Sequence, residues 1–334
     1  MTKRQTITFK NPAYIAGSYS IAGKKEARGP LGKTFTQIME DEYFGEKTHE
    51  GAERKMFETA IAGAIETSPL DKDEIEIMFS GDLLNQITSS TFAARTFDTM
   101  FIGIYGACST MALTLAMAAC MIDAGHIQNA VASAGSHFAT AERQYRTPLE
   151  LGNIRPPTAQ WTVTGVGATV LTATPDPDMP RITSVTFGRV CDWGISDPNN
   201  MGAAMAPSAA QTFVAHFRDT KTTPADYCHI FTGDLGKLGE NILRDLLADE
   251  NYPVDANYTD CGRLVYDTTQ TQYQGASGCG CSAICLNGFI LDKLRSGEYK
   301  KILLLGTGAL LSTTSSFQGE TIPGISHAVV IESN

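Results

Sequence analysis

A cysteine at the junction of a predicted strand and a predicted helix is the residue best placed for chemistry in this sequence. Residues 106–110 read Gly-Ala-Cys-Ser-Thr, and a long apolar helical run follows Cys108 directly. A helix N-terminus presents unpaired N–H groups and positive potential, which lower the pKa of a thiol and stabilise a nearby anion. The small neighbours of Cys108 allow a ligand to approach closely. A core cysteine packed beneath the helix is an equally good interpretation of the spacing alone.

The second half of the sequence repeats landmarks of the first half in the same order. The matching segments are 79–83 with 231–235, 108–109 with 281–282, Gly135 with Gly308, and 165–171 with 324–330. In both halves the glycine lies 27 positions after the cysteine that precedes it. This order predicts a duplicated α/β unit, divided into residues 1–175 and 176–334, with one pocket where the two copies meet.

Helical and strand patterns alternate around these landmarks in both halves. The predicted helices are 51–67, 88–97, 108–124, 209–218, 241–249 and 281–295. The predicted strands are 75–80, 100–105, 129–134, 228–232 and 301–305. Helices that alternate with buried, uncharged strands indicate mixed sheets covered on both faces. We therefore expect stacked α and β layers.

Composition excludes several classes of function. The chain has 334 residues, of which 43% are hydrophobic, so it can bury a large core. A net charge of −10 with scattered Lys and Arg argues against nucleic-acid binding. The sequence predicts neither a signal peptide nor a membrane-spanning helix. The eight cysteines form no ligand-pair framework, so we expect a reduced, cytoplasmic protein without a metal or other cofactor.

A serine and a histidine that follow a predicted strand are the second candidate for chemistry. Ser136 and His137 come directly after strand 129–134, and the repeat geometry is expected to bring this loop toward Cys108. A Cys–His pair can activate sulfur, while the same residues also suit the lining of a pocket without turnover. Both interpretations stay open.

The two Gly-Asp-Leu turns place one aspartate after a strand in each half. We expect Asp82 and Asp234 to cap the segments that follow them. Calcium binding by either carboxylate alone would be weak, because a calcium site collects six or more oxygen ligands. Any calcium is therefore expected to arrive with a ligand.

The segment Gly-Ala-Cys-Ser at 106–109 resembles the nucleophile signature of thiolases and ketoacyl synthases, and the duplication resembles their fold. A closer resemblance, to the stage V sporulation protein AD family of spore-forming bacteria, covers nearly the whole chain. It is carried by 81–86 (GDLLNQ), 106–110 (GACST), 136–146 (SHFATAERQYR), 202–207 (GAAMAP), 278–283 (GCGCSA) and 307–312 (TGALLS). The resemblance implies a thiolase-like α/β fold of duplicated α-β-α-β-α layers, with two mixed five-stranded sheets and pseudo-twofold symmetry.

The second half departs from the catalytic pattern that the resemblance would supply. Where ketoacyl synthases carry a histidine after the second-half strand, residues 233–234 read Gly-Asp. Where a Gly-His or Gly-Asn pair precedes the second-half helix, residues 276–279 read Ala-Ser-Gly-Cys. Covalent catalysis needs such partners as well as a thiolate. The resemblance therefore implies a binding protein that is not an enzyme and has no catalytic residue.

The implied ligand is dipicolinic acid (pyridine-2,6-dicarboxylate), bound as the free acid or as its calcium chelate. A planar dianion calls for N–H donors, hydroxyl groups, a guanidinium and flat apolar walls. The predicted ligand-binding residues are Cys108, Ser109, Thr110, Ser136, His137, Arg143 and Arg146. The sequence does not decide which arginine would contact the ligand.

The resemblance also implies a place of action. The protein would be the soluble subunit of a membrane complex that moves dipicolinate during sporulation and germination, held at the forespore or spore inner membrane by membrane subunits. A homodimer through the uncharged strand 100–105 is a further option. The alternative hypotheses are an acyl-transferase with Cys108 as nucleophile and His137 as base, and a purely structural scaffold.

Overall fold

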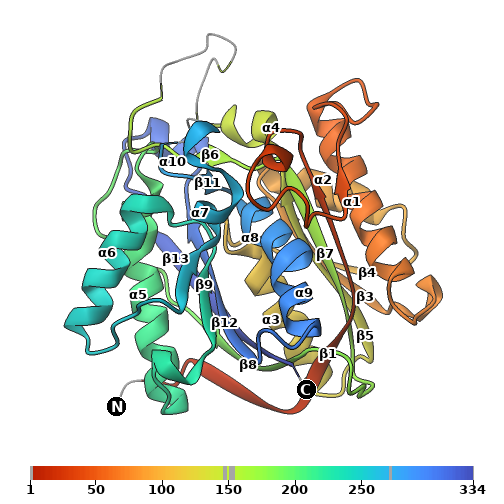
Figure 1. Ribbon diagram of the computed structural model, residues 1–334. Helices are drawn as coiled ribbons and strands as arrows, with labels where there is room; N and C mark the ends of the chain where they lie inside the picture. Colours follow the sequence, from red (N-terminus) through yellow and green to blue (C-terminus); the bar gives the residue numbers. More distant parts are fainter. Residues whose placement is uncertain (1–2, 146–148, 150–154, 271–272, 334) are drawn as a thin grey trace.

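The computed structural model describes residues 3–145, 149, 155–270 and 273–333. The predicted Arg146 lies outside the described residues. The described part folds into two sets of five strands that lie on either side of a central group of helices, with further helices outside (Figure 1). This arrangement confirms the predicted α-β-α-β-α layers.

The two sets of strands have the same topology. The first set, in sheet order, is β4 (Met100–Gly103), β3 (Ile77–Asp82), β5 (Asn129–Ser136), β7 (Gly165–Thr172) and β1 (Thr6–Ala22). The second is β10 (Tyr258–Asp260), β9 (His229–Thr232), β12 (Lys301–Ala309), β13 (Gly324–Glu332) and β8 (Arg181–Phe187). In each set the first three strands are parallel, and the last two pair antiparallel. The predicted duplication is therefore visible in the strand order, whereas the boundary at residues 175 and 176 stays a prediction.

The expectation of two separate five-stranded sheets is corrected by the structure. Strands β1 and β8 pair with each other, so the described strands of both sets belong to one sheet of eleven, with the short β2 (Gln37–Ile38) beside β1. The physical reason is the length of β1, which has 17 residues. Its beginning follows β8 and, after a register shift, its remainder follows β7.

Helices cover the outer faces of both sets of strands and fill the space between them (Figure 1). The outer helices are α1 (His49–Glu66), α2 (Thr88–Ala94), α5 (Met201–Thr220) and α6 (Gly236–Asp249). The central helices are α3 (Thr110–Asp123), α8 (Cys279–Cys285) and α9 (Leu291–Arg295). Shorter helices are α4 (Phe138–Glu142), α7 (Cys261–Val265) and α10 (Thr313–Phe317), and β6 (Trp161–Thr162) pairs with β11 (Ala276–Ser277).

Sequence patterns located the main elements well and misjudged some of their ends. The helix predicted at 209–218 begins at Met201, because Pro207 lies within the helix rather than before it. The helix predicted at 281–295 is interrupted by a π-helical turn at Leu286–Ile290. Strand β12 extends to Ala309, four residues beyond its predicted end. Over the described residues no helix is long and apolar enough to cross a membrane.

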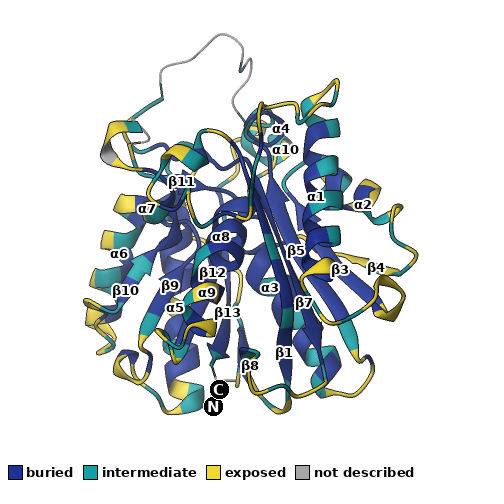
Figure 2. Cartoon of the chain, turned by 45° about the vertical axis from the view of Figure 1, so that its right-hand side comes forward, coloured by how far each residue is buried: buried dark blue, intermediate teal, exposed yellow. Residues whose placement is uncertain are grey.

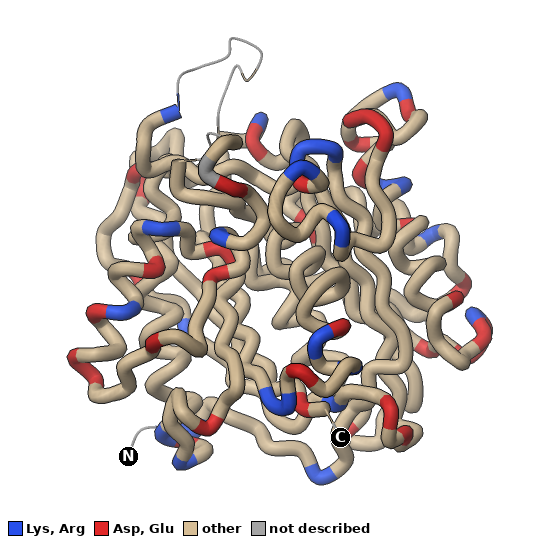
Figure 3. Tube along the Cα trace, viewed as in Figure 1, with Lys and Arg blue, Asp and Glu red and all other residues tan. Residues whose placement is uncertain are grey.

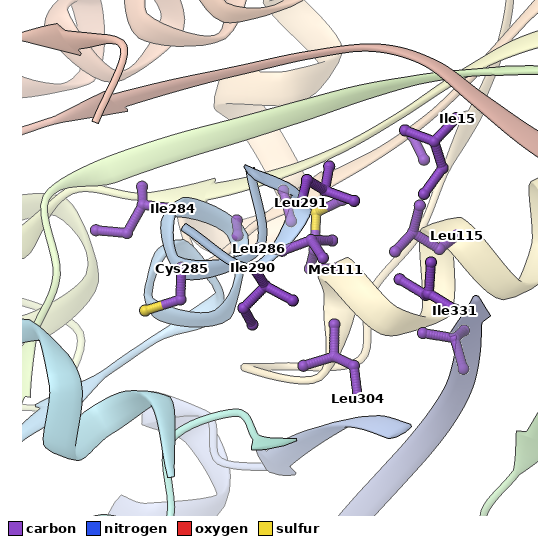
Figure 4. Packing of buried hydrophobic residues seen from close by; sticks show 14 of the residues in the cluster. Ile15, Met111, Leu115, Ile284, Cys285, Leu286, Ile290, Leu291, Leu304 and Ile331 are labelled. Atoms are coloured by element: carbon purple, nitrogen blue, oxygen red, sulfur yellow. The ribbon is translucent and has the colours of Figure 1, made fainter. Parts of the chain in front are cut away.

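The core lies around the central helices. Met111 and Leu115 of α3 pack in one cluster with Ile284 of α8, Leu304 of β12 and Ile15 of β1 (Figure 4). Dark blue buried positions run through most of the strands and the inner helix faces (Figure 2), while charged residues of both signs are spread over the outside (Figure 3). Burial of this apolar surface joins the two halves and fixes the start of α3 against the second half.

Candidate functional site

A pocket opens where the two halves meet, and Cys108 lies in its wall. The polar side chains that line it among the described residues include Tyr105, Gln144, Tyr145, Thr162, Ser277 and Ser312. Its apolar walls include Leu83, Met201 and Leu311. The first half supplies Cys108, both tyrosines and Thr162, whereas Ser277, Ser312 and Met201 come from the second half. The predicted pocket between the copies is thus present, with an uncharged lining among the described residues.

The turn that carries Cys108 is tight and internally bonded. Ala107 has a φ of 49°, in the left-handed region that non-glycine residues rarely adopt. The carbonyl of Gly106 accepts hydrogen bonds from the N–H and hydroxyl of Ser109, and the carbonyl of Ala107 accepts the same two kinds from Thr110. The expected free N–H donors at Ser109 and Thr110 are therefore already used. Their hydroxyl groups likewise face the turn, and neither residue lines the pocket.

Glycines of the second half allow this turn to lie directly against β12. A Cβ atom at Gly308 would come within 2.4 Å of the carbonyl oxygen of Gly106, and one at Gly306 within 2.9 Å of that of Ser109. Real Cβ atoms essentially never approach backbone atoms so closely. The two glycines therefore let the Cys108 turn reach the carboxyl end of β9, where residue 234 lies.

Asp234, which follows β9, is a second-half carboxylate whose charge raises the pKa of the Cys108 thiol. Its carboxylate also accepts hydrogen bonds from the N–H of Gly278 at 2.8 Å and the hydroxyl of Thr307 at 2.7 Å, and a longer one from Ser277. It is 1% exposed. Donors from β12 and from the start of α8 therefore hold this carboxylate in a buried position where the two halves meet.

The electrostatics around the sulfur of Cys108 oppose formation of a thiolate. Burial raises the pKa of the Cys108 thiol well above its ordinary value, and the neighbouring Asp234 and Cys279 raise it further. Burial also raises the pKa of Asp234 to about 6, while the hydrogen bonds from Thr307 and Gly278 hold it down. At neutral pH Asp234 is mostly ionised and Cys108 is a thiol. The depressed thiol pKa expected from the helix start is therefore corrected.

Two other first-half candidates, Ser136 and His137, form their hydrogen bonds with backbone groups away from Cys108. Ser136 is fully buried, and its hydroxyl donates to the carbonyl of Val163 at 2.8 Å. Nε2 of His137 lies 2.9 Å from the carbonyl oxygen of Glu42, and its Nδ1 accepts from the N–H of Ala139 as the cap of α4. Burial lowers the pKa of His137 to about 4. Both ring nitrogens of His137 therefore have partners other than Cys108, and the approach of this loop to Cys108 stays a prediction.

The predicted arginine contact is also placed elsewhere. Arg143 forms an exposed ion pair with Glu50 at 3.4 Å and does not line the pocket. A guanidinium that sequence reasoning passed over, Arg155, lies nearer the interior and pairs with the fully buried Glu142. The carboxylate of Glu142 also accepts from the N–H of Thr162. Arg143 and Arg155 therefore both form ion pairs with glutamates of the chain.

The histidines of the second half have structural partners. Nδ1 of His216 lies 2.7 Å from the hydroxyl of Thr186, and its Nε2 lies 2.6 Å from that of Tyr227. His229 contacts the hydroxyl of Thr259. His327 packs edge-on against Phe187.

Sequence reasoning found the right segments but not always the right side chains. Of the seven predicted ligand-binding residues, Cys108 is the one that lines the pocket among those the structure describes. Gln144 and Tyr145 lie inside the segment chosen for its arginines, and Ser312 ends the segment 307–312. These three residues lie within the segments that carry the family resemblance. Their hydroxyl and amide groups, which can form hydrogen bonds with a ligand, were the signal that could have identified them. A ligand role for the other predicted residues stays a prediction.

Two comparisons of sequence place the chain among known proteins. The family described as stage V sporulation protein AD (SpoVAD) matches residues 3–332. Stage V sporulation protein AD of Bacillus subtilis (strain 168) is 43% identical over 332 residues, which is 99% of this chain and 98% of that protein.

Solved structures with a similar fold are condensing enzymes of low sequence identity. Cerulenin-bound OleA of Xanthomonas campestris is 18% identical, with a TM-score of 0.61 over 99% of this chain and 100% of that one. The 3-oxoacyl-[acyl-carrier-protein] synthase III of Aquifex aeolicus VF5 is 13% identical, with a TM-score of 0.58 over 96% of this chain and 99% of that one. These likenesses confirm the thiolase-like fold.

Proposed function

The chain belongs to the stage V sporulation protein AD family, and from that premise we propose that it binds dipicolinic acid, free or as the calcium chelate, without turning it over. It acts as a subunit of a spore membrane complex that moves dipicolinate during sporulation and germination. The observation that carries this proposal is a pocket lined by residues of both halves, in which Cys108 is the only thiol among the described lining residues.

The chemistry of the pocket suits a small planar ligand. Leu83, Met201 and Leu311 offer apolar surface for a ring, while Tyr145, Thr162 and other hydroxyl groups offer hydrogen bonds to carboxyl oxygens. No Lys or Arg is among the described lining residues. A dianion would therefore meet few charges of opposite sign, whereas its calcium chelate is neutral. This difference favours the chelate.

The proposed mechanism is binding and release. Asp234 cannot serve as a strong base for Cys108, because its pKa of about 6 lies far below that of the buried thiol. His137, the base of the alternative acyl-transferase hypothesis, has both ring nitrogens near backbone partners. The pocket therefore retains the architecture of a condensing enzyme and supplies contacts instead of chemistry.

Partners of two kinds complete the proposal. Membrane subunits of the same complex would hold the protein at the forespore or spore inner membrane. A second copy would pair along β4, where Met100 is 58% exposed and Ile102 is 39% exposed on an edge strand. Tyr105, which lines the pocket, lies two residues beyond the end of this strand.

Calorimetric titration with dipicolinate, in the presence and absence of calcium, tests the proposal. We expect binding with Ca²⁺ to be tighter than binding without it. Thr162→Val removes the hydroxyl that lies 3.1 Å from that of Tyr145 and should weaken binding about tenfold, the effect of one lost hydrogen bond. Thr172→Val, at a matched buried threonine away from the pocket, should leave affinity unchanged. Absence of binding at millimolar ligand would remove the proposal.

The acyl-transferase alternative makes a separate prediction. Acylation would attach the acyl carbon of a thioester to the Cys108 sulfur and release the donor thiol. Intact-mass spectra after incubation with acyl-CoA of several chain lengths should show no adduct. An adduct that is lost in Cys108→Ala would establish the alternative.

A further inference from the structure

We propose that Gln144 is a specificity-determining residue of the pocket, because its fixed side-chain amide offers the ligand an acceptor oxygen and no donor. A ligand that carries a metal ion or hydrogen-bond donors is then preferred over one that carries only acceptors. This inference rests on the proposed function, since it names the form of dipicolinate, the calcium chelate, that the same pocket selects.

The first support is the orientation of the Gln144 amide. Its Nε2 donates to the carbonyl oxygen of Leu83 at 2.6 Å and to that of Thr140 at 3.2 Å. The reverse orientation would bring the amide oxygen against the same two carbonyl oxygens, and acceptors at such short range repel one another. A side-chain amide has two N–H donors, and both are used here. The polar atom that Gln144 can still offer to the pocket it lines is therefore Oε1.

The same two hydrogen bonds hold the amide in place before any ligand binds. Leu83 belongs to the turn after β3, and Thr140 belongs to α4, so the side chain of Gln144 is tied to two elements. A long side chain normally loses rotamer freedom when it contacts a ligand, and this cost opposes binding. Because folding has already fixed the Gln144 amide, its oxygen is preorganised.

The second support is another neutral acceptor, from the second half of the chain. Ser277 also lines the pocket, and its hydroxyl donates to the carboxylate of Asp234 at 3.3 Å. A hydroxyl group has a single proton, so the lone pairs of Ser277 Oγ are what remain for a ligand. No Asp or Glu is among the described lining residues. The acceptors of the pocket therefore carry no formal charge.

The third support is the chemistry of the two forms of the ligand. Free dipicolinate presents carboxylate oxygens and a ring nitrogen, which are all acceptors at neutral pH. In the chelate these groups bind Ca²⁺, which collects about six to eight ligands and so keeps positions for water or for further oxygen atoms. Metal-bound water donates hydrogen bonds. An amide oxygen therefore matches the metal side of the chelate and opposes the free dianion.

The described residues do not form a calcium site without the ligand. Over residues 3–145, 149, 155–270 and 273–333, no group of three or more His, Cys, Asp or Glu side chains could hold a metal ion. The neutral oxygens of Gln144 and Ser277 are far fewer than the ligands that calcium collects. The ion is therefore expected to bind together with dipicolinate and not before it.

Calorimetric titration of the natural protein with three probes tests this inference. The probes are dipicolinate with the calcium chelator EGTA, dipicolinate with equimolar Ca²⁺, and isophthalate (benzene-1,3-dicarboxylate) with Ca²⁺. Isophthalate has the shape and charge of dipicolinate but lacks the ring nitrogen that completes the chelate. The chelate should bind about tenfold more tightly than free dipicolinate, whereas isophthalate should gain nothing from Ca²⁺. Equal affinity for the two forms of dipicolinate would overturn the inference without any variant.

Gln144→Met removes the acceptor and keeps the length of the side chain. The ratio of the dissociation constants of free dipicolinate and chelate should fall about tenfold, because only the chelate loses a hydrogen bond from metal-bound water. Gln160→Met is the matched control. Nε2 of Gln160 donates to the carbonyl oxygens of Asp234 and Ala276 at 2.6 and 2.9 Å, and Gln160 does not line the pocket. Its ratio should keep the natural value.

The ratio separates recognition of the ligand from support of the fold. A variant that merely loosens α4 weakens the binding of both forms equally, so an unchanged ratio in Gln144→Met overturns the inference. Ser277→Ala provides a second measurement if Gln144→Met fails to fold, and its ratio should fall roughly threefold. Binding of neither form removes the proposed function and this inference together. Binding of both forms with equal affinity removes this inference alone.

Discussion

The aspartates of the two Gly-Asp-Leu turns occupy equivalent places in the two halves and have different partners. Asp82 follows β3 and accepts from the N–H of Leu84 and from the N–H and hydroxyl of Ser90, so it serves its own turn and the next helix. Asp234 follows β9 and accepts from residues 44 and 73 positions away, Gly278 and Thr307. The expected capping role is confirmed for Asp82 and is wrong for Asp234.

A different aspartate caps the second-half turn. Asp260, at the end of β10, accepts from the N–H groups of Leu235 and Gly236 at the beginning of α6. This replacement leaves Asp234 free to accept hydrogen bonds from Gly278 and Thr307 where the two halves meet. The comparison shows that a duplicated turn can keep its sequence and its fold while one copy acquires a new contact.

The largest expected difference between the two aspartates is in stability. Asp234→Ala would leave the N–H of Gly278 and the hydroxyl of Thr307 buried without a partner, and should lower the free energy of unfolding by about 3–5 kcal/mol. Asp82→Ala frees donors that lie near the exposed turn 85–86, where water can replace part of the loss, and should cost about 1–3 kcal/mol. Urea unfolding of both variants measures the difference. Equal losses of unfolding free energy in the two variants would show that the contacts of Asp234 at the junction add no stability beyond those of Asp82.

The pH dependence of stability is a smaller test that treats the two aspartates alike. Burial raises the pKa of both Asp82 and Asp234 to about 6, from an ordinary value of about 3.8. The folded state therefore binds a proton more tightly than the unfolded state. The stability that each carboxyl group contributes is fully present below pH 3.8 and is lost as the pH rises through 6, by about 3 kcal/mol.

Substitution isolates this contribution from other groups. Buried His137 and His216, whose pKa values are lowered to about 4, act in the opposite direction between pH 4 and 6.5. Unfolding of the natural protein and of Asp234→Asn at pH 4.5 and 7.5 should therefore be compared as a difference. The natural protein should lose more stability than the variant over this range. Asp82→Asn should behave in the same way, because burial raises the pKa of Asp82 to the same value.

The smallest expected effect on stability concerns the outer edges of the two halves. β4 exposes Met100 and Ile102, whereas Tyr258 and Asp260 of the equivalent β10 are buried. If two copies pair along β4, Ile102→Lys should produce monomers in sedimentation velocity, with a change in unfolding free energy within about 0.5 kcal/mol. Thr259→Lys on β10 is the control and should not change the mass. A natural protein that is monomeric at every concentration would contradict pairing.

Sequence patterns were most informative where one local rule decides the outcome. The repeated landmarks predicted the duplication, and the residues around Cys108 predicted a pocket at the junction. The patterns did not show that β1 runs on from β7 to β8 and joins the two sheets, because pairing over such a distance leaves no local signal. They also could not show that the N–H of Ser109 is satisfied by its own turn, since that depends on the left-handed backbone of Ala107.

The path of β1 also bears on how the chain can be synthesised. Thr6 and Thr8 are synthesised well before their partners on β8, Thr186 and Ser184, which follow only after the rest of the first half has been made. The leading end of β1 must therefore wait as an open strand while its later residues pair with β7. A nascent first half therefore exposes an unpaired strand edge until β8 has been made. Chaperone binding would be most valuable at this stage.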